Sequence, residues 1–275
     1  MGGSHLSGPP SVPVALPGGL EQLLAGDDPT CVWRNEAGGL TFALAPAGGP
    51  PRRYLKWAPA GTAASLPLRA EAERLRWAAA FTPVPRVLGE GGDADGEWLL
   101  TAALPGRSAV EDPWRARPAD AVRAVGRGLR ALHDALPVAA CPWRWSAGSR
   151  LARVREAAER GVHPRRELPV GPDRLSLSEA LARLADVPDD DLTVVCHGDA
   201  CAPNTLVDTD GGWAGHVDLG RLGVGDRWAD LAVATWSTEW NYGPGWERPL
   251  LEAYGVEPDP ARTAWYRLLW DASPD

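Results

Sequence analysis

The spacing of hydrophobic residues changes about a third of the way along the chain. Before residue 106, hydrophobic positions occur in short runs broken at Gly and Pro, a pattern typical of β-strands, with one stretch of helical spacing among them. The predicted strands are residues 32–45, with a turn at 38–39, and residues 53–57, 84–88 and 97–104, and the predicted helix is residues 68–80. This order predicts a small antiparallel sheet that carries one helix.

After residue 106 the pattern changes to long amphipathic helices. The predicted helices are residues 119–135, 150–160, 176–185 and 227–239, together with most of the last thirty residues. Between them, residues 192–196 form a short apolar run, and residues 205–218 have the pattern of a hairpin that turns at 210–212. We therefore expect an α+β fold of two lobes, residues 20–106 and 107–275. Residues 1–19 are rich in Gly, Pro and Ser and are expected to be disordered.

Composition narrows the class of protein. The 275 residues are 44% hydrophobic and 23% charged, close to the values for an ordinary globular protein. The formal net charge of −8 argues against nucleic acid or an anionic membrane as a partner, although it suits a cationic ligand. No apolar run approaches the ~20 residues needed to span a bilayer, and the first residues lack the pattern of a signal peptide. We expect a cytoplasmic protein that is a monomer or a weak dimer.

Arginine has replaced lysine almost completely, and Lys56 is the only lysine in the chain. A compact ammonium group and a planar guanidinium are not interchangeable where one point charge must fit between phosphates. The survival of a single lysine therefore indicates a position at which arginine cannot serve.

The strongest local signal is a His-Gly-Asp sequence at residues 197–199, followed by Asn204 and, fourteen residues later, by Asp218. Phosphoryl transfer needs oxygen ligands for Mg²⁺ and a carboxylate that orients the accepting hydroxyl and takes its proton. Asp199, Asn204 and Asp218 supply these groups. Taken singly, each could instead cap a turn or be a loop carboxylate. A zinc site at the neighbouring Cys and His residues is a further reading, but their spacing fits no recognised zinc pattern.

These motifs resemble the aminoglycoside phosphotransferases, which share the fold of eukaryotic protein kinases. The resemblance rests on residues 197–204 and 218–232 and extends to short matches along most of the chain. It implies ATP and Mg²⁺ as cofactors, with Asp199 as the catalytic carboxylate and Asn204 and Asp218 as Mg²⁺ ligands. Residues 20–106 would form the nucleotide-binding lobe, and residues 107–275 the catalytic and substrate-binding lobe.

The same resemblance implies a set of nucleotide contacts in the first lobe. Lys56 would contact the α- and β-phosphates and pair with Glu71. Tyr54 would stack on adenine, and the backbones of Thr101 and Ala103 would contact the adenine edge. The lone lysine thus falls where the family needs one.

Several polar residues of the second lobe are interpreted as structural. His197, Gly198, Asp226 and Asp230 are expected to support the catalytic loop, and the acidic run 189–191 is expected to be solvated charge.

The resemblance implies transfer of the γ-phosphoryl group to a 3′ or 3″ hydroxyl of an aminoglycoside antibiotic, which confers resistance. Glu239 and Asp271 are candidates to bind the substrate amines, whereas Trp240 and Trp270 would wall an aromatic pocket. An aromatic pocket favours the alternative substrate, another hydroxylated antibiotic such as a capuramycin-type nucleoside. A kinase-like binding module without activity is the third possibility.

Overall fold

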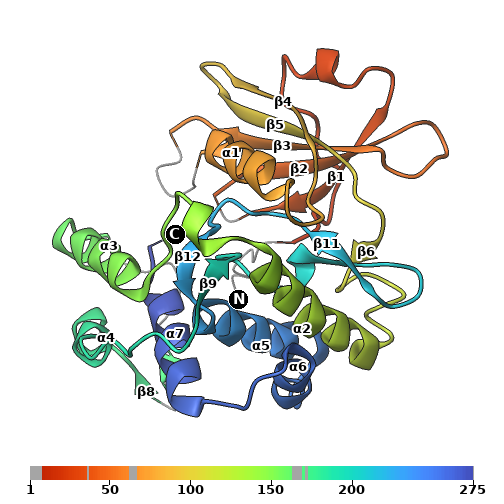
Figure 1. Cartoon of the computed structure of the whole chain (residues 1–275). Coiled ribbons are helices and arrows are strands. Elements are labelled where there is room, and N and C mark those ends of the chain that lie inside the picture. Colours follow the sequence, from red (N-terminus) through yellow and green to blue (C-terminus); the bar gives the residue numbers. More distant parts are fainter. Residues whose placement is uncertain (1–7, 36, 62–66, 163–168, 171–172, 275) are drawn as a thin grey trace. The chain divides into compact units, whose positions relative to one another are not determined.

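The computed structural model describes residues 8–35, 37–61, 67–162, 169–170 and 173–274 (Figure 1). The chain forms two compact units. The N-terminal unit consists of Met1–Ala80 with Val84–Leu104, and the C-terminal unit of Phe81–Pro83 with Pro105–Asp275. The sequence places the division after residue 106, two residues further along the chain.

The N-terminal unit is a five-stranded antiparallel sheet with one helix. The sheet order is β1-β2-β3-β5-β4. The elements are β1 (Asp28–Arg34), β2 (Leu40–Ala45), β3 (Arg53–Pro59), α1 (Leu68–Ala78), β4 (Val87–Gly92) and β5 (Gly96–Ala102). Phe42, Leu44, Leu55 and Leu100 from the three central strands form a buried cluster with Leu20, so alternate residues of these strands supply the core.

Strand β4 begins and ends later than its sequence predicts. Residues 84–88 are the hydrophobic stretch, but the strand extends over glycines that have little strand propensity. The indole of Trp98 on the neighbouring strand explains these glycines, since a Cβ on Gly91 would lie 2.7 Å from its ring. The cross-strand contact, rather than local propensity, therefore sets the position of β4.

Residues 1–19 are predicted to be disordered, but residues 8–19 have a defined place in the structure. Residues 1–7 lie outside the described part of the chain. Gly8 and Arg34 exchange two backbone hydrogen bonds of 3.0 and 2.9 Å. Val14 and Leu16 pack against the buried cluster of the sheet. The scattered apolar residues of this Gly- and Pro-rich segment thus give it a place on the N-terminal unit.

The C-terminal unit is mainly helical. Its helices are α2 (Pro118–Ala135), α3 (Ala147–Glu159), α4 (Leu177–Leu184), α5 (Trp228–Tyr242), α6 (Glu247–Tyr254) and α7 (Pro260–Ala272). Among its strands, β10 (Thr205–Val207) lies between β6 (Arg107–Ser108) and β11 (Trp213–His216) and pairs with both. In addition, β9 (Thr193–Cys196) pairs with β12 (Gly223–Asp226), and β7 (Pro169–Val170) pairs with β8 (Asp173–Arg174). Among the described residues, no helix combines the length and the apolar character needed to cross a membrane.

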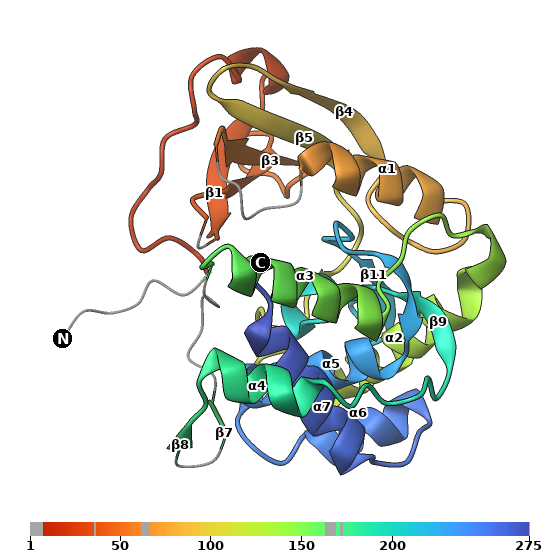
Figure 2. The same cartoon turned by 90° about the vertical axis from the view of Figure 1, so that its left-hand side faces the viewer.

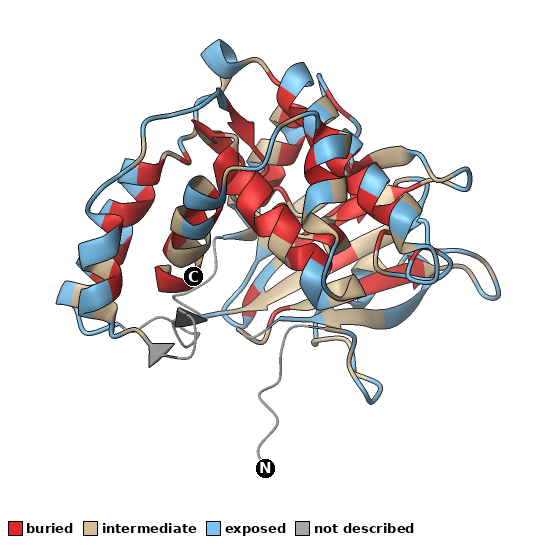
Figure 3. Cartoon of the chain, turned by 90° about the horizontal axis from the view of Figure 1, so that it is seen from below, coloured by how far each residue is buried: buried red, intermediate tan, exposed pale blue. Residues whose placement is uncertain are grey.

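Helix α5 is the centre of the C-terminal unit. It packs against α2, α6 and α7, while α3, α4 and α7 pack together on another side (Figure 2). Every residue from Trp228 to Thr235 is buried, as expected for a helix that is apolar on all faces (Figure 3). The two polar side chains within this stretch, Asp230 and Thr235, are buried with it.

Candidate active site

In the N-terminal unit, the only lysine of the chain makes a close ion pair. Nζ of Lys56 on β3 lies 2.7 and 2.9 Å from the two carboxylate oxygens of Glu71 on α1. The Glu71 side chain is 7% exposed and that of Lys56 is 24% exposed. The buried carboxylate thus holds the ammonium group at a point that remains open to solvent. The sequence predicts this pair.

The other predicted nucleotide contacts lie on β3 itself, on the neighbouring strand β5, or directly after β5. Tyr54 on β3 is directly opposite Thr101 on β5, and the Thr101 hydroxyl donates to the Tyr54 carbonyl at 3.5 Å. Thr101 also pairs with Val87 on its other side, so its backbone is part of the sheet. The Ala103 N–H donates to the Arg52 carbonyl at 2.9 Å. The predicted contact of Ala103 with a base would therefore be made by its carbonyl group.

In the C-terminal unit, two short strands bring Asn204 and Asp218 to the same end of a hairpin. Thr205 at the start of β10 pairs with His216 at the end of β11. One residue further out, the N–H of Val217 donates to the carbonyl of Asn204 at 3.0 Å. Asp218 follows directly. Like Asn204 and Asp199, it is half-buried. The hairpin therefore places an amide and a carboxylate at one partly open position.

The catalytic loop, residues 197–204, enters from β9 and is fixed by its own side chains. Nδ2 of Asn204 donates to the carbonyl of Asp199 at 2.9 Å. The His197 ring accepts from the Asp199 N–H at Nδ1 (3.2 Å) and contacts the Val217 carbonyl at Nε2 (3.0 Å), which requires the tautomer with the proton on Nε2. His197 thereby joins the loop that carries Asp199 to the residue before Asp218.

Asp230, in the first turn of α5, anchors the start of the loop. Its Oδ2 accepts from the N–H of His197 at 2.5 Å, and its Oδ1 accepts from the N–H of Gly198 at 2.9 Å. Nε2 of His133 on α2 lies 3.0 Å from the same carboxylate, and Nδ1 of His133 lies 2.8 Å from the hydroxyl of Tyr254. Burial opposes ionisation of Asp230, but the hydrogen bonds and the charge of His133 outweigh it and lower the pKa of this carboxyl. The sequence predicts the supporting role of Asp230 but not its partners His133 and Tyr254.

Two backbone conformations in this region are unusual. Gly198 has φ of +82°, and a Cβ there would overlap the carbonyl oxygen of Arg221, so only glycine fits. Asp218 has φ of +65°, and among the described residues only Ala25 shares a positive φ without being glycine. A non-glycine residue held in this region is costly and is found at functional sites more often than elsewhere. The conformation of Asp218 therefore supports its selection as a site residue.

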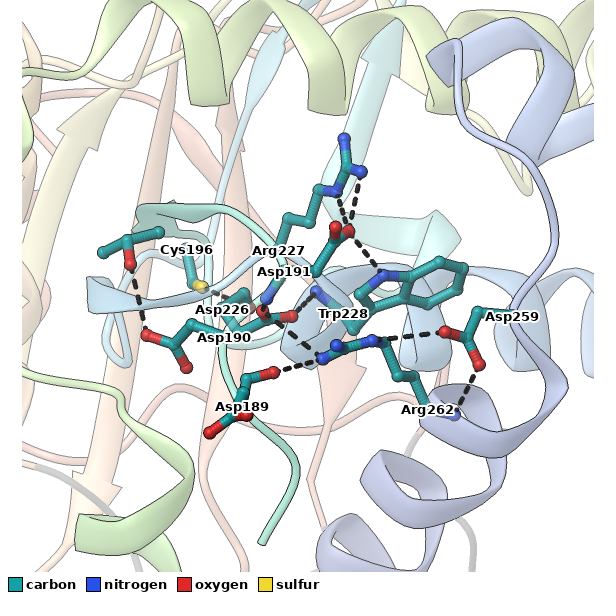
Figure 4. A network of polar contacts seen from close by, with 10 residues as sticks. Asp189, Asp190, Asp191, Cys196, Asp226, Arg227, Trp228, Asp259 and Arg262 are labelled. Carbon is teal, nitrogen blue, oxygen red and sulfur yellow. Dashed lines mark hydrogen bonds and ion pairs between the residues drawn. The ribbon is translucent and has the colours of Figure 1, made fainter.

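A polar network fixes the strand that leads into the loop (Figure 4). Asp226 is opposite Thr193 at the start of β9, and its carboxylate accepts from the N–H groups of Trp228, at 2.7 Å, and Asp191. The Asp191 carboxylate accepts from Nε of Arg227 at 2.7 Å and from Nε1 of Trp228 at 2.9 Å. Asp226 is structural, in line with its interpretation from sequence. Asp191 is exposed, as predicted for the acidic run 189–191, and its carboxylate is in addition a hydrogen-bond acceptor at the beginning of α5.

The four predicted substrate residues have different environments. Glu239 and Trp240 are exposed near the end of α5, and the Trp240 ring lies 5.0 Å from that of Trp236. Asp271 on α7 is only 5% exposed, so it does not present a carboxylate at the surface. The guanidinium of Arg221 lies 5.4 Å from the centre of the Trp270 ring and occupies one of its faces.

Comparisons with known proteins identify the family of the chain. The sequence pattern described as the phosphotransferase enzyme family matches residues 34–266. The chain is 36% identical to an aminoglycoside 3′-phosphotransferase of Streptomyces fradiae, over 86% of this chain and 92% of that protein. It is 38% identical to the streptomycin 3″-kinase of Streptomyces griseus, over 89% of this chain and 92% of that protein.

A solved structure of an aminoglycoside phosphotransferase is also similar to this chain. The aminoglycoside phosphotransferase APH(3″)-Id of Streptomyces rimosus, in complex with ADP and streptomycin, aligns with a TM-score of 0.68 at 31% identity. The alignment covers 90% of this chain and 92% of that one. The predicted α+β kinase-like fold and the prediction of an enzyme are confirmed. The chain belongs to the phosphotransferase enzyme family.

Proposed function

We propose that the protein transfers the γ-phosphoryl group of ATP to a hydroxyl of an aminoglycoside antibiotic, at the 3′ or the 3″ position, and so confers resistance. The observation that carries this proposal is the arrangement of Asp199, Asn204 and Asp218. One hairpin and one loop hold them together, as shown by the hydrogen bonds from Asn204 to Asp199 and from Val217 to Asn204. Relatives named for both positions, 3′ and 3″, have similar identity to this chain, so the proposal retains both.

The residues present fit both cofactors. The Lys56 ammonium group, held by Glu71, suits the α- and β-phosphates of ATP. Asn204 and Asp218 offer the oxygen ligands that Mg²⁺ prefers, and the amide nitrogen of Asn204 is engaged with Asp199, which leaves the amide oxygen for a metal. When bound, Mg²⁺ supplies charge neutralisation at the triphosphate.

The chain's own residues would then act on the acceptor. The Asp199 carboxylate accepts the hydrogen bond of the acceptor hydroxyl, aligns its oxygen with the phosphorus and takes its proton. His197 and Asp230 keep this carboxylate in place, because they fix the backbone on both sides of Gly198. Since the transition state has little covalent chemistry for the protein to perform, positioning of this kind is its main contribution.

The exposed carboxylate of Glu239 is the group that we propose to bind a substrate amine. The net charge of −8 would add a long-range attraction for a polycation. The ring of the exposed Trp240, beside that of the half-buried Trp236, is the observation that favours the second candidate, a kinase for a nearly neutral hydroxylated antibiotic such as a capuramycin-type nucleoside. In either case we propose a monomer or weak dimer in the cytoplasm, where ATP is available.

A coupled assay of ADP release tests this function. The acceptors are streptomycin, an aminoglycoside with a free 3′ hydroxyl, and a capuramycin-type nucleoside, each measured against ATP alone. We expect turnover with at least one of the two aminoglycosides and none above background with the nucleoside. The opposite result would support the second candidate. ATP binding without turnover on any acceptor would instead indicate a binding module.

A further inference from the structure

Helix α5 contacts the catalytic loop at a second point besides Asp230. Two turns later on the helix, Oγ of Ser237 accepts a hydrogen bond of 2.9 Å from the N–H of Ala202. Ser237 and Ala202 are both fully buried. Ser237 lies seven positions after Asp230, which corresponds to about 10 Å along the helix. One helix therefore supports the loop at both ends, with Asp199 between the two contacts.

The N–H of Ala202 needs an acceptor from elsewhere. Ala202 is the first residue of the 3₁₀-helix Ala202–Asn204, and the first N–H groups of a helix have no acceptor within it. A buried backbone N–H without a partner is costly, so the Ser237 hydroxyl fixes the start of the turn that ends at Asn204. The same turn is also held by Ser108, whose Oγ donates to the Pro203 carbonyl at 2.8 Å.

Ser237 differs from its neighbours on α5. The hydroxyl of Thr235 accepts a hydrogen bond of 3.0 Å from Nη2 of Arg267 on α7. As donors, the hydroxyl of Thr235 bonds to the carbonyls of Leu231 and Ala232, and that of Thr238 bonds to the carbonyl of Thr235. These are the local bonds expected of a hydroxyl in a helix interior. Ser237 instead accepts from the N–H of Ala202 on the catalytic loop. Nδ2 of Asn241 donates to its Oγ at 3.2 Å and to its carbonyl at 2.7 Å.

We propose that Ser237 is a positioning residue for phosphoryl transfer, acting through the N–H of Ala202 on the loop that carries Asp199 and Asn204. Asn241 assists by fixing the Ser237 hydroxyl. The proposal rests on the proposed function, since it assigns the positioning to that reaction. Its physical basis is that a displacement of about 1 Å in a catalytic group costs on the order of 10²-fold in rate.

The test compares Ser237→Ala with Thr238→Ala. Both remove one buried hydroxyl from adjacent positions of α5, but only Ser237→Ala removes an acceptor from the loop. We expect kcat to fall by between about 10-fold and about 10²-fold in Ser237→Ala alone. The KM for ATP should change less than kcat, because the proposed phosphate contacts Lys56 and Glu71 are in the other unit. Thr238→Ala also removes a buried methyl group, so a loss of thermal stability in this variant without the loss of kcat separates stability from positioning.

Hydrogen exchange supplies a readout that does not depend on turnover. Exchange at the Ala202 amide should become faster in Ser237→Ala and remain as in the wild type in Thr238→Ala. If Ser237→Ala does not fold, Ser237→Cys is the second variant, because a thiol is of similar size and a weak acceptor. It should show the same two effects to a smaller extent.

Equal kcat and equal exchange at Ala202 in the Ser237 and Thr238 variants would overturn the proposal. So would a Ser237→Cys variant that matches the wild type in both. If the wild-type chain phosphorylates none of the acceptors, the proposed function fails, whereas faster exchange at Ala202 would still establish Ser237 as the anchor of the loop.

Discussion

The side-chain amide of Asn204 donates a hydrogen bond of 2.9 Å to the backbone carbonyl of Asp199. This bond connects two residues with different proposed roles, a metal ligand and a catalytic carboxylate. Because the nitrogen of the amide is committed to the loop, its oxygen is the atom that remains to bind Mg²⁺. The same bond fixes the loop between the proposed metal ligand and the proposed catalytic carboxylate.

Removal of either proposed ligand should change the Mg²⁺ dependence of the reaction. Asp218→Ala should abolish activity, because it removes the charged ligand, and Asn204→Ala should raise the Mg²⁺ concentration needed for half-maximal rate. The measurement is kcat over a Mg²⁺ titration. Asp208→Ala is the control, since this carboxylate lies in the same hairpin but only accepts from the N–H groups of the turn. The assignment is wrong if Asn204→Ala and Asp208→Ala have the same Mg²⁺ curve.

Lys56→Arg should impair the use of ATP although the charge is retained. The forked guanidinium is larger than the ammonium group that fits between the two oxygens of Glu71, and it cannot occupy the same point between phosphates. We expect a higher KM for ATP and a lower kcat in steady-state kinetics. Arg52→Lys is the matched control, because that exposed residue lies just before the same strand. ATP kinetics like those of the wild type in Lys56→Arg would make the lone lysine a coincidence of composition.

The free energy of unfolding should decrease as the pH decreases, because of His216. Burial of its ring, with the neighbouring His197 as a smaller cause, lowers the pKa of His216 well below the ordinary value of 6.5. The unfolded chain therefore binds a proton near pH 6.5 that the folded chain does not, so stability declines as pH falls below that value. One such group contributes at most about 1.4 kcal/mol per pH unit.

Urea unfolding at several pH values between 5.5 and 8 measures this effect. In His216→Leu the titrating group is absent, so the decline in the free energy of unfolding below pH 6.5 should be smaller than in the wild type. The two proteins should differ by a constant amount above pH 7.5. Parallel curves over the whole range would show that His216 is not the group responsible.

If the acceptor is a polycation, replacing Glu239 and replacing Trp240 should have different effects on its KM and on the salt dependence of this KM. Screening acts within a Debye length of about 8 Å at physiological ionic strength, so the KM for an aminoglycoside should rise with salt. Glu239→Gln should raise this KM, weaken its dependence on salt and leave the KM for ATP unchanged. Asp271→Asn should reduce stability rather than affinity, because Asp271 is buried. A salt-independent KM together with a larger loss in Trp240→Ala would favour the nearly neutral acceptor.

The sequence predicts the groups that lie close together in the chain better than it predicts their supports. The spacing from Asp199 to Asn204 is within one loop, and the hairpin that adds Asp218 has a recognisable turn at 210–212. The ion pair of Lys56 and Glu71 also follows from the resemblance. In contrast, the bond from His133 to Asp230 joins residues 97 positions apart, and no local pattern indicates it.

Burial of polar side chains is the second part that the sequence does not give. Asp271 is a candidate from sequence to bind a substrate amine, yet its side chain is buried. Ser237 is a small residue in an apolar helix, and only the position of Ala202 reveals its role. The glycines of β4 likewise depend on Trp98 of another strand.

The most direct test of the proposed function follows the γ-phosphoryl group itself. ATP labelled at the γ-phosphorus is incubated with the protein and streptomycin, or with an aminoglycoside that has a free 3′ hydroxyl, and the esterified hydroxyl is located by NMR. We predict label on a 3′ or 3″ oxygen with the wild type. In Asp199→Asn we predict transfer reduced by about 10²–10⁴-fold, with ATP binding retained. Label found only in inorganic phosphate, or transfer by Asp199→Asn above about a tenth of the wild-type rate, would contradict the proposed function.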